Sequence, residues 1–390
     1  MKIFVTGIGV VSAIGVNAEE NLRSLKSRTT GIGKSSVYNL MLGEVLLSNE
    51  QIIQMLNLPN EDFSRTTLLG LLAAKEAWGN NKHPGKIRSG LISSTSVGGL
   101  DRTEKYYFET QKDKSSNSHK LMTHDNGRTT ERIAFELGIS GYVDTISTAC
   151  SSGANAIMQG ARLIAANKLD RVMVGGSDPL ALFDIKGFSS LNIYDKDTCK
   201  PFDQSRAGLN LGEGAGFLVL ESEHSISITG NRPVCIVSGW NNSSDAFHQT
   251  TSSADGKGAY LAMTNALTKA NITSEKINYI NAHGTGTGNN DLSESIALKN
   301  VFGDNIPPFS STKGFTGHTL AAAGAIEAVY CVQSILSQAI LPNLNFSTPM
   351  TETGMIPETT FKSGVQVEYV LSNSFGFGGN CTCLIFSKVH

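Results

Sequence analysis

Short apolar, β-branched runs alternate along the chain with segments whose apolar residues recur at helical spacing. Residues 142–149, 171–178 and 214–221 are predicted strands, each bordered by glycine or other small residues. Residues 65–78 and 259–270 are predicted amphipathic helices. The same patterns predict strands at 2–6, 90–95, 234–239, 276–281, 365–373 and 383–387, and a helix at 18–25. Strands that alternate with helices indicate βαβ units and therefore an α/β protein.

The chain divides into two halves with the same order of elements. A polar stretch at residues 223–232 separates them, and the second half begins with a strand ending in glycine, as the first half does. Residues 148–156 and 317–325 each place a reactive side chain ahead of an alanine- and glycine-rich helix. We infer an internal duplication, with one half at residues 1–229 and the other at residues 230–390.

Two stretches near the N-terminal end carry weaker signals. Residues 101–125 are rich in Lys, Ser and Asp, so we expect them to form surface or lid structure. A dinucleotide-binding loop is not expected, because Gly7-Ile-Gly9 is followed by Ser12 where that fingerprint requires glycine or alanine.

Composition and charge exclude several classes of partner. The 390 residues are 40% hydrophobic, which allows a large core, and their 32 basic and 34 acidic residues give a formal net charge of −2. These charges are spread along the sequence, so we expect no nucleic-acid partner and no polybasic membrane patch. No apolar run reaches the roughly 18 residues of a membrane span, and the start lacks the apolar region of a signal peptide. We therefore expect a soluble, cytoplasmic protein without a membrane partner.

The cysteines indicate no metal site, because they are scattered without metal-ligand spacing. They are Cys150, Cys199, Cys235, Cys331, Cys381 and Cys383. We interpret all but Cys150 as reduced core thiols. Cys150 differs because a predicted strand ends and a small-residue helix begins there. The unpaired N–H groups and the helix dipole at such an elbow favour the thiolate, the form that attacks an acyl group. For an isolated cysteine, a small buried residue in a tight turn would be the more common interpretation.

Three further stretches carry side chains suited to the same chemistry. Residues 281–287 (NAHGTGT) place His283 where a strand breaks into glycines, and Lys313 stands five residues before His318 at another elbow. Residues 373–379 (NSFGFGG) form a glycine-aromatic turn. Each stretch alone is as consistent with a structural role. Together with the cysteine, they supply a nucleophile and donors for an enolate or oxyanion, which acyl-thioester chemistry needs.

At these motifs the chain resembles the β-ketoacyl-acyl carrier protein synthases, the condensing enzymes of the thiolase superfamily. The resemblance runs nearly end to end through VTGIGVVSAIG, TACSSG, CKPFD, LGEGAG, AHGTGT, GHTLAAAGAIEA and NSFGFGG. The combination of one cysteine and two histidines is similar to the elongating, decarboxylating branch. The resemblance implies a thiolase-like fold, with two duplicated βαβαβαββ halves in five layers, αβαβα. The nucleophilic cysteine would lie in the N-terminal half and the two histidines in the C-terminal half.

The resemblance also implies a reaction and roles for individual residues. An acyl group would move from a carrier protein to Cys150, and malonyl-carrier protein would then lose carbon dioxide and attack that acyl group. His283 and His318 would stabilise the enolate oxygen through their ring N–H groups. Backbone N–H groups of Cys150 and Phe377 would form the oxyanion hole, and Phe377 would also act as an aromatic gate. No metal or nucleotide cofactor is implied, only the phosphopantetheine arm of the carrier protein.

Four more residues match positions that support the site in this family. Lys313 matches the lysine that positions the histidine region, and Glu327 matches the glutamate that pairs with it. Asp291 and Glu294 match acidic residues that help to shape the site.

The implied partners are an acyl carrier protein, with its malonyl and acyl thioesters, and a second synthase subunit in a homodimer or heterodimer. Because carrier proteins are acidic, we expect a local basic patch, with Arg65, Lys200 and Arg206 as candidates.

Two departures from the family pattern concern the substrate. Asn380-Cys381 stands behind the gate where the family usually has Thr or His followed by Asn. Residues 123–133 are polar, where fatty-acid enzymes line the acyl pocket and dimer contact with apolar residues. Either the acyl pocket is polar or these residues are solvated. Residues 199–214 are similar to those of specialised synthases, such as the synthases of aryl-polyene pigments.

Two other functions remain open from the sequence. A non-condensing partner subunit, like the chain-length factors, would lack the nucleophilic cysteine, which is present here as Cys150. A thiolase-type enzyme would act on coenzyme A esters without decarboxylation, and thiolases carry a second cysteine as base, which His318 does not match.

Overall fold

A computed structural model describes residues 1–59, 61–79, 87–112 and 118–389. Its centre is a mixed sheet in the strand order β10-β9-β13-β14-β8-β1-β7-β6-β4-β5. The first half of the chain contributes β1 (Phe4–Val11), β4 (Ser89–Ser94), β5 (Tyr142–Ile146), β6 (Arg171–Asp178) and β7 (Gly214–Glu221). The second half contributes β8 (Cys235–Ser244), β9 (Tyr279–Asn281), β10 (Phe309–Ser310), β13 (Tyr369–Gly376) and β14 (Asn380–Ser387).

The two halves of this sheet repeat one pairing pattern. From β1 outward, the neighbours β7 and β6 are antiparallel, and β4 and β5 then follow in parallel. From β8 outward, β14 and β13 are antiparallel, and β9 and β10 follow in parallel. The halves join only where Phe4 and Val5 pair with Ile236 and Cys235. We propose that this repeat reflects the division of the chain into residues 1–229 and 230–390.

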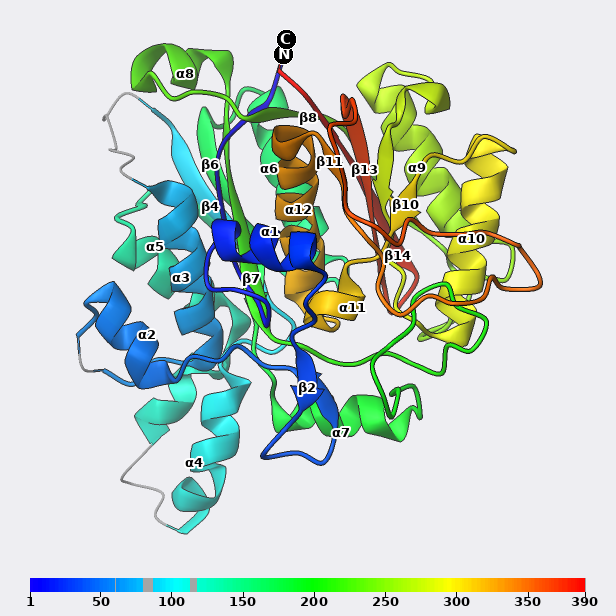
Figure 1. Cartoon of the computed structure of the whole chain (residues 1–390). Coiled ribbons are helices and arrows are strands. Elements are labelled where there is room, and N and C mark those ends of the chain that lie inside the picture. Colours follow the sequence, from blue (N-terminus) through cyan, green and yellow to red (C-terminus); the bar gives the residue numbers. More distant parts are fainter. Residues whose placement is uncertain (60, 80–86, 113–117, 390) are drawn as a thin grey trace.

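Helices complete five layers, as the fold class predicted. Helices α6 (Ser152–Ala165) and α12 (Ala323–Ser337) lie between the two halves of the sheet and contact both. Helices α3 (Arg65–Trp78) and α5 (Asn126–Glu136) cover the outer face of the first half, and α9 (Lys257–Ala270) and α10 (Gly288–Phe302) cover that of the second. Figure 1 shows α12 between these outer layers. The predicted αβαβα arrangement is confirmed.

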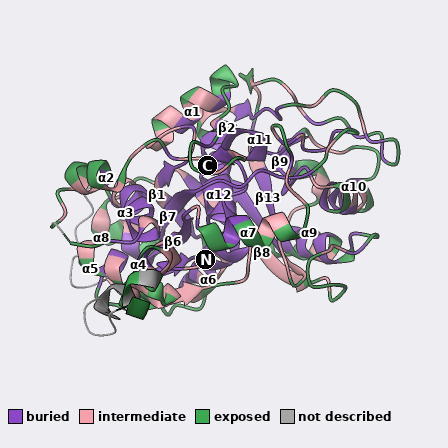
Figure 2. Cartoon of the chain, turned by 90° about the horizontal axis from the view of Figure 1, so that it is seen from below, coloured by how far each residue is buried: buried purple, intermediate pink, exposed green. Residues whose placement is uncertain are grey.

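The central helices are rich in apolar residues and largely buried, because they pack against both halves of the sheet. One helix among the described residues, Leu320–Ser337, is long and apolar enough to cross a membrane, but 89% of it is buried inside the protein. It is therefore a core helix (Figure 2). Two glycines let the starts of the central helices touch. A Cβ on Gly153 would lie 2.7 Å from the Ala325 nitrogen, and one on Gly324 would lie 2.9 Å from the Ala154 nitrogen.

Local sequence signals set several boundaries. Helix α3 spans the predicted residues 65–78 because Ser64 caps its first turn and Gly79 ends it. The predicted strand at 142–149 is too long, since β5 ends at Ile146 and a turn follows. The motif at 373–379 is only partly a turn, because β13 continues to Gly376.

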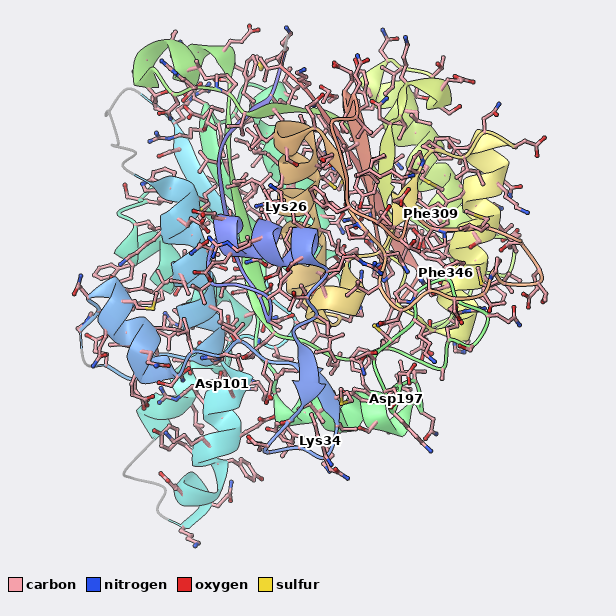
Figure 3. The ribbon with its side chains drawn as sticks, viewed as in Figure 1. Lys26, Lys34, Asp101, Asp197, Phe309 and Phe346 are labelled. Carbon is pink, nitrogen blue, oxygen red and sulfur yellow. The ribbon has the colours of Figure 1, made fainter. Side chains whose placement is uncertain are left out.

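The remaining elements lie around the edges of this core. They are α1 (Ala18–Ser27), β2 (Ile32–Lys34), β3 (Met41–Gly43), α2 (Asn49–Leu56), α4 (Leu100–Lys112), η1 (Ser118–His124), α7 (Leu182–Ser190), α8 (Glu223–Thr229), η2 (Ser274–Lys276), α11 (Lys313–Thr316), η3 (Leu320–Ala322), β11 (Ala339–Ile340) and β12 (Lys362–Ser363). The polar stretch at 223–232 thus contains a short helix, and the stretch at 101–125 contains α4 and η1, with 113–117 outside the described residues. Exposed charges are scattered: Lys26 lies on α1, Lys34 on β2 and Asp197 in the loop after α7 (Figure 3).

Candidate active site

The nucleophile candidate Cys150 lies in a tight elbow between β5 and α6. Ala149 takes a left-handed backbone conformation with φ of 53°. The Ser152 hydroxyl holds the turn by accepting from the Thr148 amide at 2.8 Å and donating to the Ala149 carbonyl at 2.5 Å. Cys150 is 5% exposed and lines a cavity of about 270 Å³. The elbow therefore presents the sulfur to the cavity while protecting most of it from solvent.

The second half repeats this elbow ahead of α12. Leu320 has φ of 51°, and Gly324 follows it by four residues, as Gly153 follows Ala149. Matching the left-handed residues places Ala321 at the position of Cys150. In this alignment His318 does not correspond to Cys150. In space, the two elbows lie close together, because the central helices touch where they begin.

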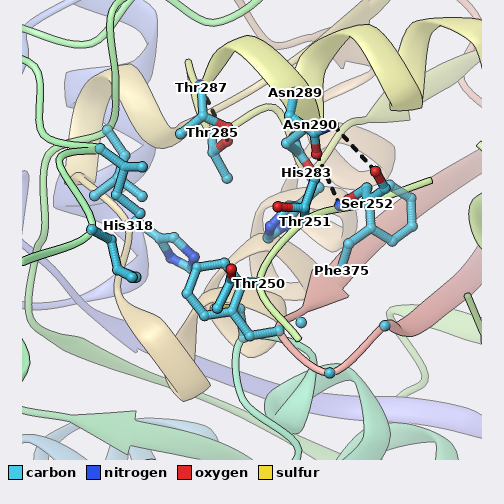
Figure 4. Close-up of a pocket in the computed structure, with 18 of the residues that line it drawn as sticks. Thr250, Thr251, Ser252, His283, Thr285, Thr287, Asn289, Asn290, His318 and Phe375 are labelled. Carbon is cyan, nitrogen blue, oxygen red and sulfur yellow. Dashed lines mark hydrogen bonds between the residues drawn. The ribbon is translucent and has the colours of Figure 1, made fainter. Parts of the chain in front are cut away.

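The histidines His283 and His318 lie next to each other in the same cavity as Cys150. Their ring centroids are 5.5 Å apart, and their planes cross at 85°. The Leu320 amide donates to Nδ1 of His318 at 3.3 Å, and Lys313 Nζ lies 3.3 Å from Nδ1 of His283. Lysine can only donate, so both Nδ1 atoms are acceptors and each ring carries its proton on Nε2. Both histidines can therefore offer an N–H group to an oxygen in the cavity (Figure 4).

Both histidines are neutral at physiological pH. Burial lowers the pKa of His283 well below its usual value, and the charges of Lys313 and His318 lower it further. Burial and Lys313 lower the pKa of His318 in the same way. The rings therefore act as hydrogen-bond donors rather than as cations.

Lys313 is held by an ion pair with Glu327 inside the core. Its ammonium contacts the Glu327 carboxylate, donates to the His283 carbonyl at 2.6 Å and approaches His283 Nδ1. These three contacts use all three N–H groups of the lysine. Both side chains of the pair are at most 3% exposed. Burial raises the pKa of Glu327 to about 6 despite the nearby Lys313 charge, so the carboxyl is ionised above neutral pH. The predicted pairing of Lys313 with Glu327 and with the histidine region matches this geometry.

Asp291 and Glu294 shape the loop that carries His283. The Glu294 carboxylate accepts from the backbone amides of His283 and Gly284 at 2.9 and 2.8 Å. Asp291 accepts from the Phe202 amide at 2.8 Å and from the Gly286 amide at 3.2 Å. Burial raises the pKa of both carboxyls, that of Glu294 to about 7. Neither residue lines the cavity, so both position the loop rather than touch a substrate.

The thiol of Cys150 differs from its sequence-based expectation. Burial raises its pKa to about 12, while Lys313 and the backbone N–H groups of Phe377 and Cys150 lower it by less. The prediction that the elbow favours the thiolate is therefore wrong, because loss of solvent outweighs the local N–H groups. The same two N–H groups lie next to the sulfur, beside the place where the carbonyl oxygen of a bound acyl group would need donors.

We expect slow alkylation of Cys150 in the native protein. Below its pKa a thiol gains about tenfold in thiolate for each unit of pH, and only the thiolate reacts. Iodoacetamide should therefore label Cys150 at least about tenfold more slowly than free glutathione at pH 7.5, with a rate that rises steadily to pH 9. Peptide mass mapping would measure this rate. A rate that is already constant between pH 7 and 9 would show a stable thiolate instead.

The cavity is lined by apolar side chains, here called the apolar wall, and by hydroxyl and amide side chains, here called the polar wall. Phe377 stacks on Phe188 of α7, with ring centroids 5.7 Å apart and planes 18° apart. The apolar wall is Phe188, Leu191, Ile193, Leu209, Phe375 and Phe377. The polar wall is Thr250, Thr251, Ser252, Thr285, Thr287, Asn289 and Asn290 (Figure 4). Sequence reasoning missed Phe188 and the hydroxyl-bearing residues 250–252; the dense run of Thr and Ser was the one available signal.

Asn380 supplies the hydrogen bonding behind the gate residue. Its side-chain oxygen accepts from the Ser151 hydroxyl at 2.7 Å, from Asn155 at 2.9 Å and from Asn242 at 2.7 Å. This ties the start of β14 to the cysteine-bearing helix and to β8. The departure at Asn380 is therefore compatible with an ordered gate. Its neighbour Cys381 is 6% exposed, and it lines the cavity rather than only the core.

The three basic residues expected to contact a carrier protein differ in how exposed their side chains are. The Arg65 guanidinium is occupied by Glu213, with contacts of 2.7 and 3.1 Å, and by the Val45 and Leu47 carbonyls. Its side chain is only 14% exposed, so the prediction that it contacts a carrier protein is corrected. Lys200 and Arg206 are partly exposed, and Arg206 donates to the carbonyls of residues 287 and 288 beside the cavity. These two remain candidates.

The polar run at 123–133 has two faces. Asp125 caps α5, and Arg128 and Glu131 form an exposed ion pair. Thr129 and Thr130 are buried, at 1% exposed each. Part of the run is thus solvated, and part contributes polar groups to the interior. Within the described part of the chain, no group of three or more His, Cys, Asp or Glu side chains could hold a metal ion.

The buried ion pair predicts a stability effect. Lys313→Met would leave the Glu327 carboxylate buried without its partner, so we expect a loss of about 3 to 5 kcal/mol and a clearly lower Tm. Lys362→Met is the matched control, because Lys362 also pairs with a glutamate, Glu358, but is 52% exposed. That variant should lose at most about 1 kcal/mol. Equal Tm values for the two variants would contradict the expected contribution of the buried pair to stability.

Comparisons with known proteins agree over the whole chain. The family model described as Beta-ketoacyl synthase, N-terminal domain, matches residues 1–225, and the corresponding C-terminal domain matches residues 234–347. The chain is 30% identical to 3-oxoacyl-[acyl-carrier-protein] synthase 2 of Staphylococcus aureus (strain MRSA252), covering 100% of this chain and 98% of the relative.

Two solved structures are similar over 100% of this chain and 99% of their own, at 27% identity. The ishigamide ketosynthase/chain length factor gives a TM-score of 0.93. AntDE:AntF, a type II PKS acyl-carrier protein in complex with its ketosynthase bound to the hexaketide, gives a TM-score of 0.88.

Proposed function

Because the chain belongs to the β-ketoacyl synthase family, we propose that Cys150, His283 and His318 carry out its decarboxylative condensation. Membership makes the chain a condensing acyltransferase, as predicted from the resemblance. The observation that carries the residue assignment is the shared cavity. One buried thiol and two ring N–H donors face the same space beside a pair of backbone N–H groups.

In the proposed first step, the Cys150 sulfur attacks the carbonyl carbon of an acyl thioester on a carrier protein. The sulfur–carbon bond to Cys150 forms, the bond to the carrier thiol breaks, and the cysteine proton passes to that departing thiol. The N–H groups of Cys150 and Phe377 hold the oxygen that becomes negative on the way. Burial raises the pKa of Cys150, so its sulfur must lose a proton in the course of this step.

In the second step, malonyl-carrier protein occupies the same cavity. Its carbon–carboxylate bond breaks, carbon dioxide leaves, and the electron pair moves into an enolate. His283 and His318 donate their Nε2–H groups to the enolate oxygen, which neutral rings do without a change of charge. The enolate carbon then attacks the acyl carbonyl, and the bond to the Cys150 sulfur breaks to release the β-ketoacyl product. The sulfur leaves as a thiolate and takes up a proton from water, which restores the thiol. Lys313 and Glu294 position His283 throughout.

The proposed partners follow from the same site. The polar wall of hydroxyl and amide groups suits the amide-bearing phosphopantetheine arm of an acyl carrier protein, and no other cofactor is required. The similar structures contain a carrier protein and a chain length factor, so we propose a carrier protein and a second synthase subunit as partners. Lys200 and Arg206 are the proposed contacts for the acidic carrier. We propose a cytoplasmic location, as for carrier-dependent fatty acid or polyketide synthesis.

The test is a condensation assay with the purified protein. Acyl-carrier and malonyl-carrier protein together should give β-ketoacyl-carrier protein, with one carbon dioxide released for each product. Release of carbon dioxide excludes thiolase-type chemistry on coenzyme A esters. If activity depended on a second subunit whose own cysteine became acylated, while Cys150 stayed free, the chain would instead be a non-condensing partner.

A further inference from the structure

Two buried polar atoms on the α7 side of the cavity lack a hydrogen-bond partner in the structure. They are Oδ2 of Asp184 and the hydroxyl oxygen of Tyr194. Asp184 is 7% exposed, so solvent does not satisfy its carboxyl. A buried carboxylate oxygen without a partner is costly in a folded protein, so a hydrogen-bond donor placed here would be stabilised.

The position of Asp184 links it to the active site. Asp184 and Phe188 are four residues apart on α7, and both lie on its inward face. Phe188 lines the cavity and stacks on Phe377, so Asp184 is about 6 Å along the helix axis from the aromatic pair. Asp178 interacts electrostatically with both Cys150 and Asp184, so both lie near it.

The neighbouring acidic groups are already occupied. The Asp178 carboxylate accepts from the Thr95 hydroxyl at 2.6 Å and from the Ser96 and Ala321 amides at 2.8 and 2.7 Å. The Glu104 carboxylate accepts from the two amides that begin α7, at 2.9 and 2.7 Å. Asp178 and Glu104 are therefore occupied, whereas Asp184 and Tyr194 each keep an unpartnered oxygen, as does Oδ2 of Asp195 next to Tyr194.

We propose that Asp184 and Tyr194 form a polar end of the acyl subsite, and that the acyl group carried by Cys150 bears a hydroxyl at its far end. This inference rests on the proposed function and names its substrate class. Neither Asp184 nor Tyr194 lines the cavity itself. To reach Asp184, an acyl chain would have to displace Phe377 from Phe188 and extend one turn along the inward face of α7. Tyr194 packs in the same small apolar cluster as Phe188, beside Asp184.

The chemistry of this place favours a neutral hydrogen-bonding group over the alternatives. A methyl end would leave Asp184 desolvated and unpaired. A carboxylate end would face Asp184, Asp178 and Glu104 together, and like charges at this depth repel strongly. Burial and the two neighbouring acids raise the pKa of Asp184 to about 7, so its carboxyl can donate as well as accept.

The experiment compares three acyl-carrier proteins whose chains have equal length and end in a methyl, a hydroxyl or a carboxylate. Intact mass spectrometry measures the rate at which each acylates Cys150. The native chain should prefer the hydroxyl over the methyl by about tenfold or more, with the carboxylate slowest. Asp184→Leu should reverse the preference towards the methyl. Asp184→Asn, which keeps the shape and the hydrogen bonding, should retain the hydroxyl preference.

Two further variants keep the inference falsifiable if Asp184→Leu folds poorly. Tyr194→Phe should weaken the hydroxyl preference, whereas Lys186→Leu, on the exposed face of the same helix, should leave it at the native level. Equal acylation by methyl and hydroxyl chains in the native protein, or a preference unchanged in both the Asp184→Leu and Tyr194→Phe variants, overturns the inference and leaves the proposed function standing. Absence of acylation with all three chains overturns the proposed function, and this inference with it.

Discussion

Replacement of Cys150 by alanine should lower the rate of β-ketoacyl product formation by at least about 10⁴-fold, the scale seen when a covalent nucleophile is removed. The physical reason is that no other group can take over the acyl chain at this point. Cys381 lines the cavity, but burial raises the pKa of its thiol to about 12, and it has no converging backbone N–H groups in the described contacts. Liquid chromatography with mass detection of the carrier-bound product measures the effect.

The same variant separates the two half-reactions. Because Cys150→Ala retains His283 and His318, it should still release carbon dioxide from malonyl-carrier protein while forming no condensed product. Cys235→Ala is the control, since Cys235 is a buried thiol at the start of β8 outside the cavity and should keep native activity. If Cys150→Ala protein condensed at more than a few per cent of the native rate, the proposed nucleophile would be wrong.

Replacement of either histidine by alanine should lower the rate of condensation by about 10² to 10³-fold, the usual loss when one donor to a developing oxyanion is removed. Acylation of Cys150 should continue, because neither ring donates to the acyl carbonyl in the proposed first step. The expected result is therefore an acyl-enzyme that accumulates in the intact-mass spectrum of His283→Ala and His318→Ala protein, without release of carbon dioxide or product.

The condensation rate should not depend on the protonation of His283 or His318 near neutral pH. Burial and Lys313 lower the pKa of both rings well below the usual value, so each ring is neutral and donates equally well at pH 6.5 and 8. The native condensation rate should then show no inflection from these rings in that range. His224→Ala, an exposed histidine on α8, should leave every readout unchanged. Variants that lost acylation of Cys150 as well would assign the histidines to the first step instead.

What the sequence determined by itself is local chemistry and local geometry. Hydrophobic spacing and caps depend on neighbouring residues, so residues 65–78 could be assigned as a helix with its correct ends. The elbow at Cys150 and the glycine break after His283 could be recognised because small residues and a strand-to-helix change stand next to each other in the chain. The family resemblance then followed from the order and spacing of such local motifs.

The tertiary structure decided everything that depends on contacts between distant residues. Cys150 and His318 share a cavity only because Gly153 and Gly324 let α6 and α12 touch. Arg65 looked free for a carrier protein, but Glu213, 148 residues away, encloses it. Burial likewise reversed the expected thiolate of Cys150, because desolvation is a property of the assembled core and not of a motif. The unpartnered carboxyl of Asp184 became visible for the same reason, since only the folded chain shows which polar atoms find no partner.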